Sequence, residues 1–236
     1  MASSRLPGKV LLDLAGQTVL SHVIERCNAI PSADFVCCAI SDNRDSDPVA
    51  TEAERHGATV FRGSEQDVLD RYYRAAVSIG AEIIVRVTSD CPILDPQVAE
   101  KVINLLLKED ADFSTNNSPP SWPHGLDCEA ITFDWLERAW KEAVDQFDRE
   151  HVSPFIRRHP DVKSVNLEGP GGFAVEQRWT LDYQEDIDFL RALLSQSPSY
   201  PSMPQMKDFL EVLKKNPCIS AINKNRDRGN SSNSVD

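Results

Sequence analysis

Short apolar runs alternate with helix-like stretches through the first half of this chain, and this alternation constrains its fold more than any other feature. The apolar runs at residues 35–40, 59–61 and 83–87 have the length and composition of buried strands. Amphipathic stretches follow them at residues 48–56, 68–78 and 96–108. The spacing predicts βαβ units, and therefore an α/β fold in which helices flank a mostly parallel sheet.

The second half of the chain is less regular. Its Asn-, Ser- and Pro-rich stretch at residues 116–125 predicts a loop. Strands are predicted at residues 128–133, 162–167 and 178–181, and helices at residues 135–143, 187–194 and 206–213. We expect one domain over residues 1–222, followed by a polar, disordered tail over residues 223–236.

Composition excludes several classes of protein. A formal net charge of −12 argues against a broad nucleic-acid surface, but it leaves room for a small phosphate ligand. No run approaches the roughly 20 apolar residues that span a bilayer. The six cysteines form no Cys-x-x-Cys pair, which argues against a zinc site and is typical of a reduced, cytoplasmic protein.

Two cations lie in a loop-like stretch near the N-terminus. Pro7 and Gly8 predict a turn between Arg5 and Lys9 that lets the backbone approach a ligand closely. Arg5 can grip phosphate with two nitrogens, and Lys9 adds a mobile point charge. An exposed basic loop without a ligand is the alternative interpretation.

Two carboxylates follow predicted strands. Asp90 comes after the strand at residues 83–87, and Asp182 comes after the strand at residues 178–181. Ligands of α/β sheets bind beyond the carboxyl ends of strands, and two such carboxylates can hold one Mg²⁺ or Mn²⁺ against a triphosphate. For Asp90, capping of a turn is an equally good interpretation. His124 and His151 lack the spacing of a metal site, and a structural role is more common for such histidines.

Six motifs occur in one order along the chain. They are Ser4-Arg5-Leu6-Pro7-Gly8-Lys9, Phe61-Arg62-Gly63-Ser64 with Asp67-Val68-Leu69-Asp70-Arg71-Tyr72-Tyr73, Thr88-Ser89-Asp90-Cys91-Pro92, Gly125-Leu126-Asp127, Glu150-His151-Val152 and Arg178-Trp179-Thr180-Leu181-Asp182. Together they resemble the cytidylyltransferase family of the spore coat polysaccharide biosynthesis protein F type. That family is similar to the CMP-sialic acid and CMP-3-deoxy-manno-octulosonate synthetases.

The resemblance implies a nucleotide-diphospho-sugar transferase fold and a role for each matching residue. Arg5 and Lys9 would bind phosphate, while Asp90 and Asp182 would hold the metal. Ser41, Asp42 and Asn43 would read the base, and Asp70 and Arg71 would support the nucleotide pocket. The implied acceptor-binding residues are His124, Asp127, Glu150, His151 and Arg178.

The implied reaction joins CTP to a small acidic sugar, releasing pyrophosphate, with neither nucleic acid nor membrane as a partner; a homodimer is a possible assembly. One rival is a glycosyltransferase of the same broad fold, which would carry an Asp-x-Asp motif where this chain has Ser89-Asp90-Cys91. The other rival is a truncated, non-catalytic relative. Ser89 and His124 stand where Gly and Arg are common in the family, which leaves the acceptor open.

The resembling family has a strand and a further Arg ahead of the position of Met1. In that family the strand is central to the sheet. We therefore expect the 236-residue chain to fold poorly and to be inactive unless such a strand is supplied.

Overall fold

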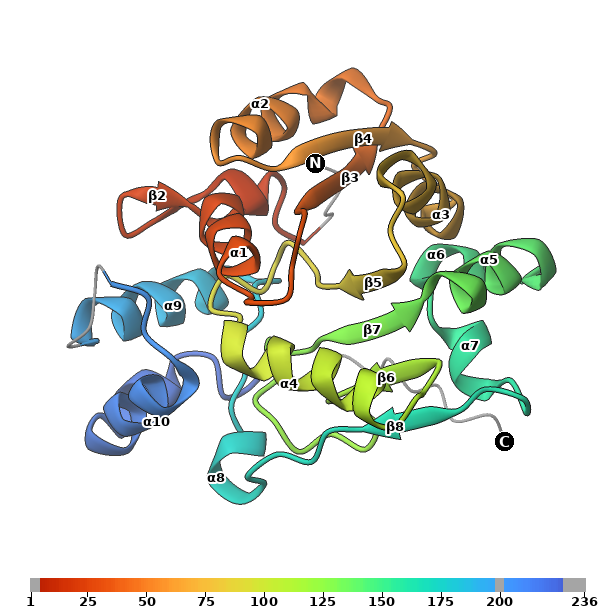
Figure 1. Ribbon diagram of the computed structural model, residues 1–236. Helices are drawn as coiled ribbons and strands as arrows, with labels where there is room; N and C mark the ends of the chain where they lie inside the picture. Colours follow the sequence, from red (N-terminus) through yellow and green to blue (C-terminus); the bar gives the residue numbers. More distant parts are fainter. Residues whose placement is uncertain (1–4, 198–201, 227–236) are drawn as a thin grey trace.

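The computed structural model describes residues 5–197 and 202–226 (Figure 1). The strands are β1 (Asp13–Leu14), β2 (Gln17–Thr18), β3 (Cys37–Ser41), β4 (Thr59–Gly63), β5 (Ile83–Arg86), β6 (Phe113–Thr115), β7 (Glu129–Thr132) and β8 (Ser164–Asn166). The helices are α1 (Val19–Asn28), α2 (Asp47–Arg55), α3 (Val68–Ile79), α4 (Pro96–Lys108), α5 (Phe133–Glu142), α6 (Gln146–His151), α7 (Pro154–Arg158), α8 (Gly172–Val175), α9 (Gln184–Gln196), α10 (Met206–Lys215) and α11 (Pro217–Ala221). Two 3₁₀ turns, η1 (Lys9–Leu11) and η2 (Arg44–Ser46), complete the set. Within the described part of the chain, no helix is long and apolar enough to cross a membrane.

Two separate sheets form the body of the molecule, beside the small β1–β2 hairpin. Strands β3 and β4 pair in parallel, and the second sheet has the order β5-β7-β6-β8. Strand β8 is parallel to β6, but β7 runs antiparallel to both of its neighbours. The predicted α/β fold with parallel pairing and flanking helices is confirmed. The four-stranded sheet is mixed because β7 enters it from the loop at residues 116–128 and runs opposite to β5.

Each face of the four-stranded sheet is covered by helices, as the alternation of side chains along a strand requires. On β7, Ala130 packs in a cluster with α4, whereas its neighbour Ile131 packs in a cluster with α3, α5 and α7. Asp95 begins α4 by accepting hydrogen bonds from the backbone nitrogens of Gln97 and Val98, and Pro96 occupies the first turn.

Two predictions about elements were wrong, and several elements were not predicted. Helix α1 was not predicted, although Thr18 caps it by accepting from the Ser21 nitrogen. Residues 178–181 are extended but form only an isolated bridge between Arg178 and His124, so they are not a strand. Asn223 lies in the predicted tail yet is only 3% exposed, because its side chain is hydrogen-bonded within the protein. The rest of that tail, from residue 227, lies outside the described residues.

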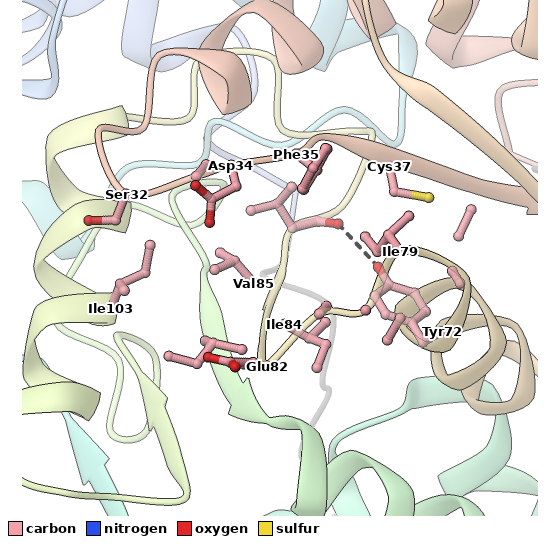
Figure 2. A pocket seen from close by; sticks show the side chains of 18 of the residues that line it. Ser32, Asp34, Phe35, Cys37, Tyr72, Ile79, Glu82, Ile84, Val85 and Ile103 are labelled. Atoms are coloured by element: carbon pink, nitrogen blue, oxygen red, sulfur yellow. Dashed lines mark hydrogen bonds between the residues drawn. The ribbon is translucent and has the colours of Figure 1, made fainter.

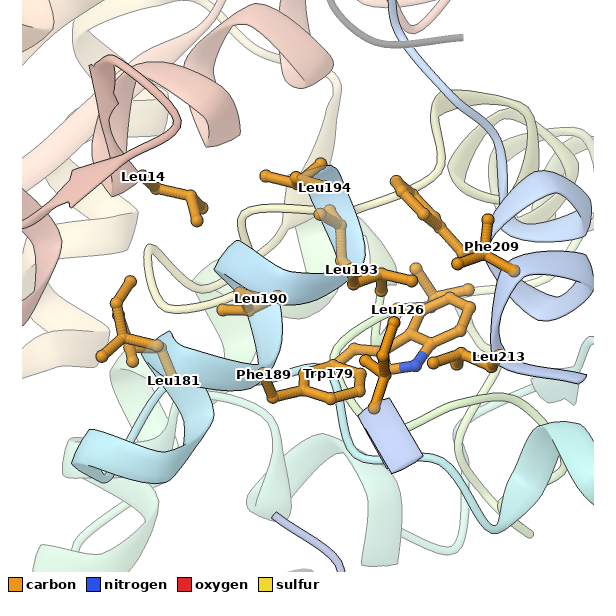
Figure 3. Close-up of a cluster of buried hydrophobic side chains, with 14 of the residues drawn as sticks. Leu14, Leu126, Trp179, Leu181, Phe189, Leu190, Leu193, Leu194, Phe209 and Leu213 are labelled. Atoms are coloured by element: carbon orange, nitrogen blue, oxygen red, sulfur yellow. The ribbon is translucent and has the colours of Figure 1, made fainter. Parts of the chain in front are cut away.

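A separate apolar cluster anchors the extended segment at residues 178–182 (Figure 3). Trp179 and Leu181 are fully buried in this cluster, against Phe189 and Leu193 of α9 and Phe209 of α10. Full burial of such side chains contributes about 1.5–3 kcal/mol each. Helices α9 and α10 therefore fix the position of this segment.

A cavity of about 440 Å³ separates the two sheets (Figure 2). Its walls include Cys37 and Ala39 of β3, Val85 of β5, Tyr72 of α3 and Ile103 of α4. Among the described residues, no strand pairs with the edge of β3 opposite β4 or with the edge of β5 opposite β7. Two unpaired, apolar strand edges facing one cavity are suited to binding an extended segment between them.

Adding an apolar strand-forming segment ahead of residue 1 is expected to raise the temperature of unfolding. Such a segment would pair with both edges, and each buried backbone group left without a partner costs about 1–3 kcal/mol. The measurements are thermal unfolding by circular dichroism and alkylation of Cys37, which lines the cavity. A Gly/Ser extension of equal length is the control. Equal melting and equal Cys37 reactivity in the two extended chains would contradict the prediction.

Candidate functional site

The segment at residues 178–182 alternates between the core and a polar cluster. Trp179 and Leu181 point into the core, and Arg178 and Asp182 therefore point to the opposite side. The Leu181 nitrogen donates to the Asp90 carbonyl at 2.8 Å, which joins this segment to the loop after β5. These contacts set Asp90 and Asp182 side by side.

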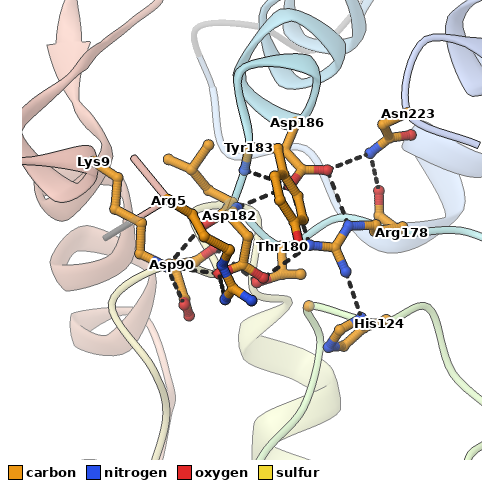
Figure 4. Close-up of polar contacts among 12 residues, drawn as sticks. Arg5, Lys9, Asp90, His124, Arg178, Thr180, Asp182, Tyr183, Asp186 and Asn223 are labelled. Carbon is orange, nitrogen blue, oxygen red and sulfur yellow. Dashed lines mark hydrogen bonds and ion pairs between the residues drawn. The ribbon is translucent and has the colours of Figure 1, made fainter. Parts of the chain in front are cut away.

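One lysine lies between the two carboxylates (Figure 4). The Nζ of Lys9 donates to Asp90 Oδ2 at 2.7 Å, to Asp182 Oδ1 at 3.0 Å and to the Leu181 carbonyl at 2.8 Å. A second cation, Arg5, donates from Nη2 to Asp182 Oδ1 at 2.7 Å. The structure thus brings together the four residues that the sequence offered for phosphate and metal binding.

The cations control the ionisation of Asp182. Burial by itself would raise the pKa of Asp182, but Lys9, Arg178 and Arg5 lower it to about 2. Burial would lower the pKa of Lys9, but Asp90 and Asp182 raise it above its ordinary value. Both groups are therefore charged at neutral pH.

A buried group of polar side chains supports Asp182 from behind. Arg178 donates from Nη2 to Asp182 Oδ2 at 2.9 Å and from Nε to Asp186 Oδ1 at 3.0 Å. Asp186 is fully buried and also accepts from the backbone nitrogens of Asp182 and Tyr183. Asn223 donates to Asp186 Oδ1 and to the Arg178 carbonyl, each at 3.0 Å.

Sequence reasoning missed the roles of Asp186 and Asn223. Asp186 reads as an ordinary acidic residue in the first turn of a helix, and it does cap α9. Asn223 lies in a polar stretch. No spacing rule connects either residue to Arg178, which was predicted to contact the acceptor but is 6% exposed and paired with two carboxylates.

The donor set between Asp90 and Asp182 fits a hard divalent cation. Two carboxylate oxygens and one backbone carbonyl converge on a single positive centre, the Lys9 ammonium. Within residues 5–197 and 202–226, no three His, Cys, Asp or Glu side chains gather as a metal site. An oxygen donor set of this kind fits an ion such as Mg²⁺ or Mn²⁺, which takes oxygen ligands and shares its shell with water and substrate phosphates.

The residues offered for base recognition lie at the carboxyl end of β3, on the other sheet: Ser41 is its last residue, and Asp42 and Asn43 follow it. Ser41 shares a hydrogen bond with Ser46 at 2.9 Å, and the Asp42 nitrogen donates to the Gly63 carbonyl. Asn43 donates to Glu65. Base recognition by these three residues stays a prediction.

Asp70 and Arg71 lie on α3 and have separate local contacts. Asp70 accepts from Arg74 and from Trp140 Nε1 at 2.8 Å, which connects α3 to α5. Arg71 donates from Nη1 to the Ser64 carbonyl at 2.6 Å and so holds the loop after β4. Asp70 thus holds α3 against α5, and Arg71 holds the loop after β4. These contacts are compatible with the predicted role of supporting the nucleotide pocket.

His124 and Asp127 lie next to Arg178. The His124 Nδ1 is 3.4 Å from Arg178 Nη1, and Asp127 accepts from the Gly125 nitrogen at 2.9 Å. Gly125 has a φ of +112°, and a Cβ there would lie 2.6 Å from the Trp179 backbone carbon. Only glycine permits this close approach, which packs the His124 loop against the segment that carries Asp182.

The structure places Glu150 and His151 on α6, which packs against α3 and α7. Both side chains are exposed, and the His151 ring contacts Phe147. Their neighbour Arg149 makes the structural contact of this motif, donating to Asp67 from Nε at 3.0 Å. Neither Glu150 nor His151 is among the residues that contact Asp90 or Asp182, and acceptor binding by them stays a prediction.

Comparison with known proteins agrees with the geometry. Residues 1–215 match the Cytidylyltransferase family. The spore coat polysaccharide biosynthesis protein SpsF of Bacillus subtilis (strain 168) is 30% identical over 224 residues, which cover 92% of each chain. A 3-deoxy-manno-octulosonate cytidylyltransferase of Anaeromyxobacter dehalogenans (strain 2CP-C) is 32% identical over 201 residues, 81% of this chain and 80% of that one.

The fold is also shared with a solved structure. A cytidylyltransferase from Leptospira borgpetersenii serovar Hardjo-bovis (strain JB197) superposes with a TM-score of 0.88 at 29% identity, over 96% of this chain and 94% of that one. With its paired carboxylates, its two cations and the family match over residues 1–215, this chain belongs to the cytidylyltransferase family.

Proposed function

We propose that this protein transfers the cytidylyl group of CTP to a small acidic sugar, forming a CMP-sugar and releasing pyrophosphate. The observation that carries the proposal is the convergence of Asp90, Asp182 and the Leu181 carbonyl on one cationic centre, with Arg5 beside it. A site of this kind binds a triphosphate and its divalent cation together. The similarity to a 3-deoxy-manno-octulosonate cytidylyltransferase supports an acidic sugar as the acceptor.

In this proposal an oxygen of the acceptor attacks the α-phosphorus, and the bond to the pyrophosphate leaving group breaks. Arg5 and Lys9 bind phosphate oxygens and neutralise the charge that moves onto the leaving group. Asp90 and Asp182 would hold a Mg²⁺ or Mn²⁺ ion, which would supply charge neutralisation and orientation of the phosphates. The protein's main contribution is positioning, because such a displacement needs little covalent chemistry from side chains.

In this proposal the acceptor sugar is bound by residues that neighbour Arg178. His124 and Asp127 flank the cluster, and Asp127 also accepts from Asn117 at 3.1 Å. Asn117 in turn accepts from Arg157 at 2.7 Å. This chain of polar groups offers donors for hydroxyl and carboxylate oxygens. The single Asp of Ser89-Asp90-Cys91 disfavours the rival glycosyltransferase.

Formation of pyrophosphate from CTP and an acidic sugar is expected to require a divalent cation. Excess EDTA should abolish it, and Mg²⁺ or Mn²⁺ should restore it. The measurement is a coupled pyrophosphate assay over a panel of acidic sugars, with neutral sugars and the other nucleoside triphosphates as controls. Turnover that persists unchanged in excess chelator contradicts the metal assignment.

Asp90→Asn and Asp182→Asn are each expected to lower turnover by about 100-fold or more, since positioned electrostatic groups commonly contribute that much. Each substitution removes one negative charge and nearly preserves shape. Asp188→Asn on the exposed side of α9 is the matched control, because its side chain is 51% exposed. Circular dichroism checks the fold. A variant that keeps turnover, or that unfolds, would show that the assignment of that residue is wrong.

Asn223→Ala is expected to raise the Mg²⁺ concentration that gives half-maximal turnover by about threefold to tenfold. The substitution removes two hydrogen bonds that hold Asp186 and Arg178 behind Asp182, and one hydrogen bond contributes about 1 kcal/mol. Asn216→Ala is the matched control, because Asn216 donates to Val212 in α10 rather than to this group. An unchanged Mg²⁺ requirement in Asn223→Ala would assign Asn223 a purely structural role.

A further inference from the structure

We infer that Lys9 is a built-in counter-ion that occupies the place of the divalent cation between Asp90 and Asp182 until the nucleotide binds. The metal would then bind together with the triphosphate and not before it. This inference rests on the proposed function, because it concerns the same two carboxylates.

The coordination of Lys9 supports this exchange. An ammonium group has three N–H donors, and the three oxygens around Nζ account for all of them. Two of these oxygens belong to Asp90 and Asp182, the carboxylates that would hold the metal. The side chain of Lys9 is only 14% exposed, so it fills the space between the carboxylates.

The surrounding charges also oppose a metal ion that arrives alone. Arg5 contacts the same Asp182 oxygen as Lys9, and Arg178 contacts the other oxygen of that carboxylate. Three positive groups therefore already neutralise Asp182. A free Mg²⁺ or Mn²⁺ would have to displace Lys9 while it is repelled by Arg5 and Arg178.

A triphosphate changes this balance because it gives Lys9 and Arg5 other anionic partners. Arg5 is half-exposed and lies over the Tyr183 ring at 5.2 Å, so its guanidinium can reach a ligand from the surface. Lys9 follows the turn at Gly8, whose φ is +68°, and its long stem lets the ammonium move without unfolding η1. Departure of both cations would leave Asp90 and Asp182 able to bind the metal that accompanies the nucleotide, while Arg178 keeps its contact with the other oxygen of Asp182.

The test is direct binding of Mn²⁺ to nucleotide-free protein, measured by electron paramagnetic resonance of the free ion. Lys9→Met keeps most of the stem and removes the charge, and we expect it to bind Mn²⁺ at least about tenfold more tightly than the wild-type chain. Lys101→Met, at an exposed position of α4, should behave as wild type. The double variant Lys9→Met with Asp90→Asn should lose the gain, which would assign it to this site.

Thermal unfolding gives a second readout that does not depend on catalysis. Mn²⁺ without nucleotide should raise the melting temperature of Lys9→Met and leave that of the wild-type chain nearly unchanged. Arg5→Met, which alters an exposed side chain, should show a smaller change in the same direction. Equal Mn²⁺ affinity in Lys9→Met and wild type overturns the inference. Tight Mn²⁺ binding by the wild-type chain in the absence of nucleotide also overturns it.

Failure of this inference is distinguishable from failure of the proposed function. If the function is correct and the inference wrong, CTP turnover requires a divalent cation while Lys9→Met binds Mn²⁺ no better than wild type. If the inference is correct and the function wrong, Lys9→Met gains Mn²⁺ affinity although no acidic sugar releases pyrophosphate from CTP.

Discussion

The backbone hydrogen bond from the Leu181 nitrogen to the Asp90 carbonyl is the contact on which the site depends. It joins a loop that follows β5 to a segment 90 residues later that is anchored by Trp179 and Leu181 in the core. Neither segment has regular secondary structure at this point, so packing from α9 and α10 supplies the rigidity that a sheet would otherwise give. Because the two carboxylates lie on the two sides of this contact, their separation is fixed before any ligand arrives.

Charge balance explains how three acidic groups can gather here. Asp90, Asp182 and Asp186 are paired with Lys9, Arg5 and Arg178, and an uncompensated buried charge would cost several kcal/mol. The inner pair, Arg178 with Asp186, is buried. The outer pair, Lys9 and Arg5, lies nearer the surface. The outer cations are the ones that we infer change partners, so the network has a buried inner part and an exchangeable outer part.

The sequence predicted local features well and long-range ones poorly. Strands β3, β4 and β5 and helices α2, α3 and α4 could be predicted because each combines a periodic apolar pattern with a cap or breaker, such as Asp95-Pro96 for α4. The antiparallel entry of β7 could not, since strand direction depends on the path of the loop before it. The family resemblance implied an acceptor contact for Arg178, which stays a prediction. Its burial depends on Asp186 and Asn223, and no local pattern reveals their positions relative to Arg178.

The spacing of the two sheets across the cavity affects the geometry of the candidate site. Ser41, Asp42 and Asn43, which we propose for base recognition, lie at the carboxyl end of β3 on one side of the cavity, and Asp90 follows β5 on the other. A nucleotide that contacts both must span the carboxyl ends of β3 and β5. The spacing of the two sheets therefore sets the distance between the residues that contact the base and those that contact the phosphates. Since protein interiors are close-packed, an extended segment that fills this cavity would fix that distance.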